Sequence, residues 1–385
     1  MNYILFDPSD IEKFYPFSLT RPLGEMRLFG GTIKEIWERR LGQRISYLTY
    51  PHLETLYGFD TGNPTTDGSD DMTELVFIPS NWVPIPDSKF DVKMFQSEEG
   101  FRNLVSLKWS DFRNDSQRKL LLRKLEESLD IAYLEKHLFK ISNNMDFILG
   151  SSTCGLNSDV NFSTHEKSNI DCSNPFFDDD DGPIIIEDGV NIMSGTMIKG
   201  PVYICKGSVI KMGTRIYGPT IIGPYCKIGG EVSNCIFLGY SNKAHEGFLG
   251  HSIIGEWCNI GAGTSNSNLK NDYGKVKMWD YTEKKFIDSG EQFLGLYMGD
   301  HSKVAINSSF NTGTTIGVNC NIFGPGFPRN FIPSFSWGGA QGFKEYDFDK
   351  ALVVLKNVLS RRDVKLTKEY VKMFHNVHVI TTKMK

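Results

Sequence analysis

The stretch from Ile186 to Gly229, IEDGVNIMSGTMIKGPVYICKGSVIKMGTRIYGPTIIGPYCKIG, decides the fold of this chain. An isoleucine recurs in it at every sixth position, at Ile186, Ile192, Ile198, Ile204, Ile210, Ile216, Ile222 and Ile228. This period fits neither an amphipathic helix nor a strand with one buried face. It is typical of the hexapeptide repeat of a parallel β-helix, in which each short strand points one aliphatic side chain into a shared interior.

The repeat continues beyond this stretch. The same step is kept by Met298, Val304, Phe310, Ile316 and Ile322, while Phe248, Ile254 and Ile260 hold a short run in a shifted phase. Several of these positions are followed by glycine, where a tight turn disfavours a side chain. An Ile-rich β-sandwich with accidental periodicity is the alternative, and eight successive matches argue against it. An aperiodic stretch, Ser265 to Glu291, is expected to form an arm or loop extruded from the β-helix.

The flanking segments predict an α/β region and a helical tail. Apolar runs at Tyr3–Phe6, 44–49 and 74–79 indicate strands, and a helical pattern lies between the first two, which favours parallel βαβ pairing. Helical patterns also cover 116–141 and 348–374, and the latter is expected to cap or pack alongside the β-helix. We therefore expect an α/β domain with a helical connector over 1–150, a polar linker over 151–182, a β-helix over 183–340 and a helical tail over 341–385.

Composition excludes several function classes. The net charge of −4 gives no electrostatic case for nucleic acid or an anionic membrane. No apolar run approaches the roughly 20 residues that span a bilayer, and the N-terminus lacks a signal-peptide pattern. The seven cysteines include no Cys-x-x-Cys pair, which disfavours a disulfide framework or a structural zinc site. The acidic run 178–181 is interpreted as a solvated turn. We expect a soluble cytoplasmic protein.

The most specific motifs are Asn242-Lys-Ala-His245-Glu-Gly-Phe-Leu-Gly250 and Asn259-Ile-Gly-Ala-Gly-Thr264. They resemble the acyltransferase domain of the bifunctional enzymes that acetylate glucosamine 1-phosphate and then form UDP-N-acetylglucosamine. That family carries Lys-Ala-Gly-His, then Leu-Gly, then Asn-Ile-Gly-Ala-Gly-Thr and an Asn-Tyr-Asp-Gly loop. The resemblance is tight over 225–335 and loose over 1–110. It implies a left-handed β-helix, assembled as a homotrimer with acetyl-CoA between neighbouring subunits.

His245 is the candidate general base. N-acetylation needs a base that works near neutral pH to take a proton from the attacking amine, and imidazole has a suitable pKa. The alternative is a surface histidine without a role, and His251 and His301 rank below it as candidates. The resemblance makes Ala262 and Ala305 contacts of acetyl-CoA, with Arg329 as a contact to its phosphate.

The same resemblance indicates a sugar-phosphate pocket. It implies that Glu231 and Asn259 hold the sugar, and the family's Asn-Tyr pair aligns with Asn268 or, after a short insertion, with Tyr273. Ser233 stands where the family has a lysine, and Phe248 where it has a tyrosine. A phosphate needs cationic or N–H donors, so Lys243, Lys270 or Arg215 is expected to supply that contact instead.

The N-terminal motif, Leu19-Thr-Arg-Pro-Leu-Gly-Glu-Met-Arg-Leu28, resembles a degenerate nucleotidyltransferase signature. Displacement of pyrophosphate concentrates negative charge, which Arg21, Arg27 and backbone N–H groups would neutralise, and the neighbouring Thr20 is a further nucleotide-binding candidate. The alternative is that both arginines make structural ion pairs. The resemblance implies Mg²⁺ for nucleotidyl transfer. The nucleotide-binding candidate Asn81 stands where the family has its magnesium-binding aspartate, and an asparagine would bind Mg²⁺ weakly, so the metal ligands stay undetermined.

Motifs and order together resemble the divergent bacterial branch of this family. They predict a sugar-1-phosphate nucleotidyltransferase and amino-sugar N-acetyltransferase that uses acetyl-CoA, a sugar phosphate, and UTP or another nucleoside triphosphate. Three alternatives stay open. The β-helix could be only a trimerisation scaffold or an allosteric site for nucleotidyl transfer. The protein could bind sugar nucleotides without catalysis, or the acyl acceptor could be a different amino sugar or a nucleotide sugar.

Overall fold

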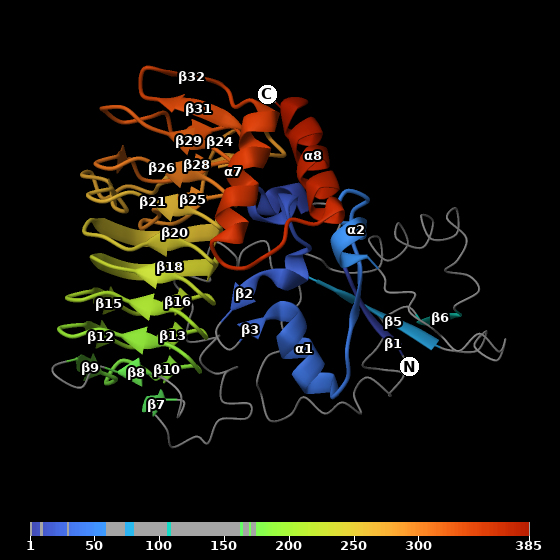
Figure 1. The fold of residues 1–385 in the computed structure, drawn as a ribbon, viewed down its shortest axis with the longest axis horizontal. Coiled ribbons are helices and arrows are strands. Elements are labelled where there is room, and N and C mark those ends of the chain that lie inside the picture. Colours follow the sequence, from blue (N-terminus) through green and yellow to red (C-terminus); the bar gives the residue numbers. More distant parts are fainter. Residues whose placement is uncertain are drawn as a thin grey trace.

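A computed structural model describes residues 2–7, 11–28, 31–58, 74–80, 106–108, 162–164, 169–170 and 175–384. It shows a tall stack of coils, with an α/β region and two long helices against its flank (Figure 1). The helix predicted over 116–141 and the candidate Asn81 lie outside the described residues.

The stack is a parallel β-helix with three faces, as the repeat predicts. Ile186 pairs with Ile204 and Ile204 with Ile222, so one coil takes 18 residues, or three hexapeptides. All eight isoleucines of the repeat are buried in one interior cluster. The side chain at every sixth position points inward because each hexapeptide supplies one short strand and one turn.

The first face consists of β7 (Phe162–Thr164), β10 (Ile184–Ile186), β13 (Val202–Ile204), β16 (Thr220–Ile222), β25 (Leu296–Met298), β28 (Thr314–Ile316) and β30 (Phe331–Ile332). The second consists of β8 (Asn169–Ile170), β11 (Asn191–Ile192), β14 (Val209–Ile210), β17 (Lys227–Ile228), β19 (Asn242–Lys243), β21 (Asn259–Ile260), β26 (Lys303–Val304), β29 (Asn321–Ile322) and β31 (Ser336–Gly339), with β32 (Gly342–Glu345) antiparallel at its end.

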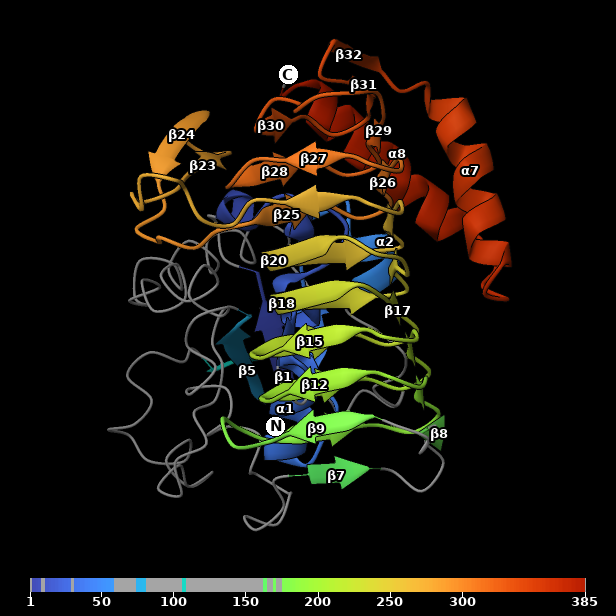
Figure 2. The same ribbon diagram turned by 90° about the vertical axis from the view of Figure 1, so that its left-hand side faces the viewer.

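The third face, turned towards the viewer in Figure 2, consists of β9 (Phe176–Asp178), β12 (Met197–Lys199), β15 (Arg215–Tyr217), β22 (Ser265–Asn266) and β27 (Ser309–Phe310). Two longer strands, β18 (Glu231–Gly239) and β20 (Phe248–Glu256), cross from the third face to the first. They bend at Asn234 and His251, whose positive φ values of 54° and 48° make the corner.

The aperiodic stretch is shorter than predicted. Ser265 and Asn266 still belong to the coil as β22, which pairs with β27. The chain then forms a hairpin of β23 (Lys277–Asp280) and β24 (Lys285–Asp288). Trp279 of the hairpin stacks on Phe331 at 4.1 Å between ring centroids. The arm therefore packs onto the β-helix, and its apolar rings explain why it does not project freely into solvent.

The N-terminal region contains the predicted parallel βαβ unit. β1 (Asn2–Phe6) pairs in parallel with β4 (Ser46–Leu48) and β5 (Glu74–Pro79), and β6 (Ser106–Lys108) adds an antiparallel edge. Helix α1 (Ile33–Leu41) begins with a capping box between Thr32 and Glu35 and ends at Gly42, whose φ of 69° closes the helix. The remaining elements are η1 (Ile11–Phe14), η2 (Phe17–Leu19), η3 (Leu23–Glu25), β2 (Arg27–Leu28), β3 (Gly31–Thr32) and α2 (Glu54–Tyr57).

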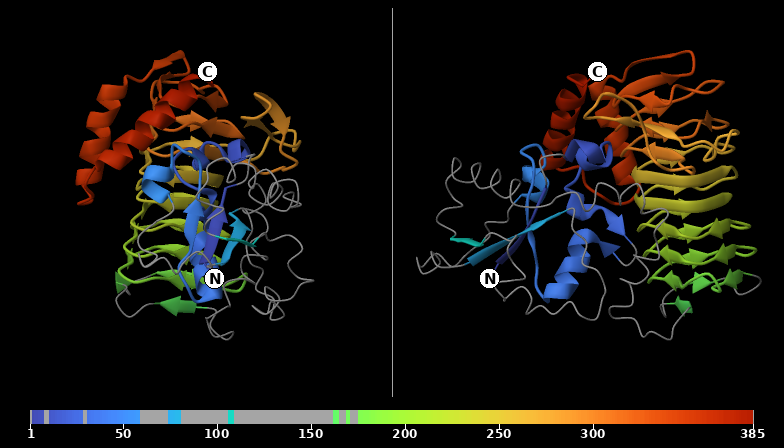
Figure 3. Two further views of the ribbon diagram at one scale, coloured as in Figure 1. Left: turned by 90° about the vertical axis from the view of Figure 1, so that its right-hand side faces the viewer. Right: turned by 180° about the vertical axis from the view of Figure 1, so that it is seen from behind.

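This region lies across the first face of the β-helix (Figure 3). Side chains of both parts form one apolar cluster, which includes Phe14, Leu23, Ile221, Ile236 and Ile253. Of the other two faces, the second is reached by the loop after α7 (Phe348–Ser360), where Arg362 donates to Asn242 Oδ1 at 3.2 Å.

The tail forms two helices where one helical pattern was predicted, α7 (Phe348–Ser360) and α8 (Lys368–Thr382). Both are amphipathic, and they bury Leu355 and Phe374 in a cluster with Trp257 and Phe335 of the β-helix corners. The tail thus packs alongside the stack. Within the described part of the chain, none of the helices is long and apolar enough to cross a membrane.

Candidate functional site

His245 lies in an exposed turn at the corner between the second and third faces. The turns of successive coils stack here. The Gly263 N–H donates to the Glu246 carbonyl at 2.8 Å, and the Asn307 N–H donates to the Ala262 carbonyl at 2.8 Å. The corner therefore carries His245, Ala262 and the turn after Ala305 one above another, so three of the predicted acyl-transfer residues share one edge.

Close stacking of these turns depends on glycine. Gly247 has a φ of 126°, and a Cβ there would collide with the Thr264 carbonyl oxygen of the next coil. The Gly261–Gly263 turn above it and the Gly229–Gly230 turn below it are packed as closely, because a Cβ at each of these glycines would also collide with an atom of the next coil. The sequence therefore places an exposed histidine on a backbone with little room to shift.

Glu231 lies beside this corner on the third face. It occupies the start of β18, in register with Arg215 of β15 and Phe248 of β20. Arg215 contacts the Glu231 carboxylate at 3.3 Å and the Glu246 carboxylate at 3.2 Å. One cation and two carboxylates thus form a partly exposed network, and one of these carboxylates belongs to Glu246, the residue after His245.

Lys243 does not reach this surface. Its side chain is 2% exposed and points into the β-helix, where its ammonium donates to the carbonyls of Gly229 and His245 at 2.9 Å each. Burial lowers the pKa of Lys243 to about 8. Sequence reasoning assigned it to the sugar pocket because of its charge, whereas its position places it beneath the turn.

Asn268 and His251 meet at the corner between the third and first faces. The Asn268 amide contacts His251 Nδ1 at 2.8 Å, and the imidazole stacks on Phe293 at 5.0 Å. Burial lowers the pKa of His251 to about 4, so the ring is neutral at pH 7. His251, which ranked below His245 in the sequence analysis, thus lies at the edge of the same face as Glu231. Its place at a strand bend, marked by its positive φ, could not be predicted from the sequence.

The other predicted contacts are more dispersed. Asn259 is exposed on the second face, in register with Asn242 and Lys303. Tyr273 is 68% exposed on the arm, and Arg329 is exposed with its guanidinium 5.8 Å from the centroid of the Phe343 ring. Glu231 and Asn259 therefore lie on opposite sides of the corner that carries His245.

The N-terminal motif faces the β-helix. Thr20 donates to the Asp300 carboxylate at 2.6 Å, and Arg21 pairs with both Asp300 and, at 2.9 Å, Glu256. Arg21 and Asp300 are 3% and 1% exposed. This is the arrangement expected from the alternative in which the motif makes structural ion pairs.

Arg27 has a similar environment. Its guanidinium lies 3.9 Å from the Glu35 carboxylate and 3.8 Å from the Cys205 sulfur on the first face. The role of Arg21 and Arg27 in nucleotide binding stays a prediction.

Asp7, at the end of β1, accepts three hydrogen bonds. Its donors are Ser80 Oγ at 2.6 Å, Thr49 Oγ1 at 2.7 Å and the Leu23 N–H at 2.9 Å. Burial raises the pKa of Asp7. Its oxygens hold the signature loop against the sheet. In the part of the chain that the structure describes, no group of three His, Cys, Asp or Glu side chains is placed to hold a metal ion.

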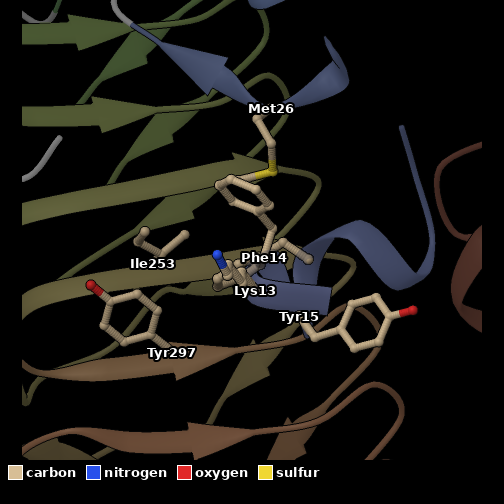
Figure 4. A pocket seen from close by; sticks show the side chains of 7 residues that line it. Lys13, Phe14, Tyr15, Met26, Ile253 and Tyr297 are labelled. Carbon is tan, nitrogen blue, oxygen red and sulfur yellow. The ribbon is translucent and has the colours of Figure 1, made fainter. Parts of the chain in front are cut away.

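A small cavity lies where the N-terminal region meets the first face (Figure 4). Its volume is about 20 Å³, enough for at most one water molecule. It is lined by Lys13, Phe14, Tyr15, Phe17, Met26, Ile253 and Tyr297. We interpret it as a packing gap.

Comparison with known proteins adds to this picture. Residues 3–168 match the model of a family described as sugar nucleotidyl transferase. The chain is also 39% identical over 144 residues to a bifunctional sugar-1-phosphate nucleotidylyltransferase/acetyltransferase of Sulfurisphaera tokodaii, a match that covers 37% of this chain and 35% of that relative. The chain thus matches about a third of the length of this curated relative.

Two solved structures align with about half of the chain. One is a hexapeptide transferase family protein from Anaplasma phagocytophilum, with a TM-score of 0.25, 15% identity and coverage of 52% of this chain and 87% of that one. The other is an Arabidopsis UDP-N-acetylglucosamine acyltransferase, with a TM-score of 0.27, 10% identity and coverage of 52% and 75%. By the sequence matches, this chain is similar to transferases, and the similarity to the sugar nucleotidyl transferase family covers residues 3–168.

Proposed function

We propose that the protein transfers the acetyl group of acetyl-CoA to the amine of glucosamine 1-phosphate, and a uridylyl group from UTP to the acetylated product. The observation that carries the first activity is the corner on which His245, Ala262 and Ala305 share one edge, with Glu231 and Arg215 beside it. The second activity is supported by the family match over residues 3–168.

In the acyl transfer, the amine nitrogen attacks the thioester carbonyl carbon. A C–N bond forms and the C–S bond breaks, so coenzyme A leaves as the thiol. His245 takes the proton that the amine loses and passes it to the leaving thiolate. Glu231, Asn259 and Asn268 would bind the sugar, and Arg215 its phosphate. The small side chains of Ala262 and Ala305 leave room for an extended acyl carrier along the edge, towards Arg329.

The site fits assembly as a homotrimer. Glu231 and Asn259 flank the corner from different faces, so a second copy seated there would complete an enclosed pocket. Large apolar side chains on the same corner support this, since Met212 is 71% exposed and Ile306 66% exposed. A second copy seated along this corner would cover both apolar side chains.

A second candidate function is acetyl transfer alone, with an N-terminal region that transfers no nucleotidyl group. The burial of Arg21 and Thr20 against Asp300 favours this candidate, because those donors are already engaged. Release of pyrophosphate from UTP with Mg²⁺ and N-acetylglucosamine 1-phosphate distinguishes the two. Pyrophosphate release supports the bifunctional enzyme, and UTP binding without release supports the second candidate.

The first test measures coenzyme A release from acetyl-CoA with glucosamine 1-phosphate. We expect turnover in the wild type and a loss of at least about 100-fold in His245→Ala, as for removal of a general base. His375→Ala, an exposed histidine on α8, is the matched control and should leave the rate unchanged. Absence of turnover in the wild type would exclude glucosamine 1-phosphate as the acceptor, and full activity of His245→Ala would exclude this histidine as the base.

A further inference from the structure

One charged side chain interrupts the aliphatic interior of the β-helix. The inward positions of the second face are Ile192, Ile210, Ile228, Lys243, Ile260, Val304 and Ile322. Lys243 takes the place of an isoleucine, paired with Ile228 below it. A buried ammonium costs several kcal/mol unless hydrogen bonds compensate it, so its presence requires a reason.

Regular turns at this corner satisfy their own backbone. Four residues after the inward residue, a hydroxyl donates to the carbonyl three residues before it. Thr196 bonds to Met193 at 2.7 Å, and Thr214 bonds to Lys211 at 2.6 Å. Ser308 repeats the arrangement with Ala305 at 2.9 Å. The corner therefore has a recurrent internal donor.

Two adjacent turns lack that donor. After Lys243 the corresponding position is Gly247, which has no side chain. After Ile228 the turn is two residues shorter, because the next inward residue is Val232, four positions on. The Lys243 ammonium donates into both turns, to Gly229 O below and to His245 O above, at 2.9 Å each. The bond to Gly229 O replaces a missing hydroxyl, and the bond to His245 O holds a carbonyl one residue further along its turn.

We propose that Lys243 is a positioning residue that fixes the backbone of the turn carrying His245. It binds the main-chain carbonyl of His245 and ties it to the coil below. The fixed backbone then sets the direction in which the imidazole points away from the surface. This inference rests on the proposed role of His245, and it replaces the expectation that Lys243 contacts the sugar phosphate.

The test is Lys243→Met, which keeps the length and volume of the side chain but removes its donors. Hydrogen exchange reports the turn directly, because the Gly263 and Glu231 amides donate to the carbonyls of Glu246 and Gly247. We expect both amides to exchange at least tenfold faster in the variant. The kcat for acetyl transfer should fall at least tenfold, with the KM for acetyl-CoA within about twofold of the wild type.

Lys303→Met is the matched control. Lys303 also donates to two carbonyls, of Trp257 at 2.7 Å and His301 at 2.9 Å, but at the corner between the first and second faces. Its loss should leave the exchange of Glu231 and Gly263 unchanged. If Lys243→Met does not fold, Lys243→Gln, which keeps two N–H donors without the charge, enters the same comparison, with a smaller increase in exchange expected.

The outcomes separate this inference from the proposed function. Unchanged exchange of both amides in a folded Lys243 variant overturns the positioning role, whatever the activity. Faster exchange in a protein whose wild type shows no acetyl transfer supports the positioning role and removes the proposed acceptor instead.

Discussion

Buried polar residues interrupt the apolar pattern of this chain where neighbouring groups need a hydrogen-bond partner. Asp7 is an example, since its carboxylate is buried and collects three donors around the end of β1. Burial raises its pKa, so the environment does not favour the charge itself. What matters at this position is the supply of acceptor oxygens.

We therefore expect Asp7→Ala to lower the free energy of unfolding by about 3 kcal/mol, because it leaves three buried donors without an acceptor. Asp7→Asn keeps one oxygen for Ser80 and Leu23, and its amide can donate to the Thr49 hydroxyl, so it should cost less than about 1 kcal/mol. Urea unfolding of both variants is the measurement. An equal loss in both would mean that the negative charge is required, as for a metal ligand.

Lys243 gives a pH dependence of stability. Burial lowers its pKa from 10.5 to about 8, while Glu246 and Cys235, the charged and titratable groups near it, act in the opposite direction. Between those values the unfolded chain binds more protons than the folded protein, so the free energy of unfolding rises with pH through this window. The stability of the wild type relative to Lys243→Met should increase by about 2 kcal/mol between about pH 7.5 and about pH 10.

Urea midpoints of the two proteins at both pH values test this, because groups common to both cancel in the difference. A difference that stays constant with pH would show that Lys243 keeps its ordinary pKa in the folded protein.

Between elements, the decisive contact joins the loop after η2 to a corner of the β-helix. Asp300 receives Arg21, Thr20 and the Glu256 N–H in a buried cluster. Removal of one partner of a buried ion pair leaves an uncompensated charge and typically costs about 3–5 kcal/mol. This cluster thus determines how firmly the N-terminal region is attached to the β-helix.

Arg21→Met and Asp300→Leu should each destabilise the protein by about 3–5 kcal/mol, and the double variant by clearly less than their sum. A double-mutant cycle in urea measures the coupling. Additive losses would contradict a direct pairing. A measured increase in UTP affinity in Asp300→Leu would indicate that the released arginine can bind a nucleotide.

The elements show what the sequence can and cannot predict. The period of six locates the inward isoleucines because every regular coil repeats the same strand and turn. It fails at the coil from Ile228 to Lys243, which takes 15 residues, because a shortened turn changes the phase without changing the residue types. The arm boundary was misplaced at Ser265 for a similar reason, since two polar residues still form β22.

The residues of the candidate site likewise divide into those that the sequence predicts and those that it does not. His245 and Ala262 can be found from local motifs because stacked turns keep a short, fixed spacing in the chain. The partner of Arg21 is 279 residues away, and neither composition nor spacing relates the two. Contacts between the domains therefore had to come from the structure.

For the whole molecule, the exposed apolar side chains at the corner that carries His245 predict self-association. We expect the wild type to sediment as a trimer, and Ile306→Asp to yield monomers, because the substitution places a charge on a surface that would be buried between copies. Val353→Asp on α7, where Val353 is 61% exposed, is the control and should stay trimeric. A wild type that is monomeric at micromolar concentration would contradict the shared site.

The long separation between Arg21 and Asp300 also has a consequence for biosynthesis. At roughly 5–20 residues per second, translation needs roughly 15 to 60 seconds to produce the aspartate after the arginine. During that interval the apolar side chains of the N-terminal region, such as Phe14 and Leu23, lack the coils of the β-helix against which they pack in the folded protein. Until those coils are made, the apolar surface of the nascent N-terminal region is exposed to other chains and to chaperones.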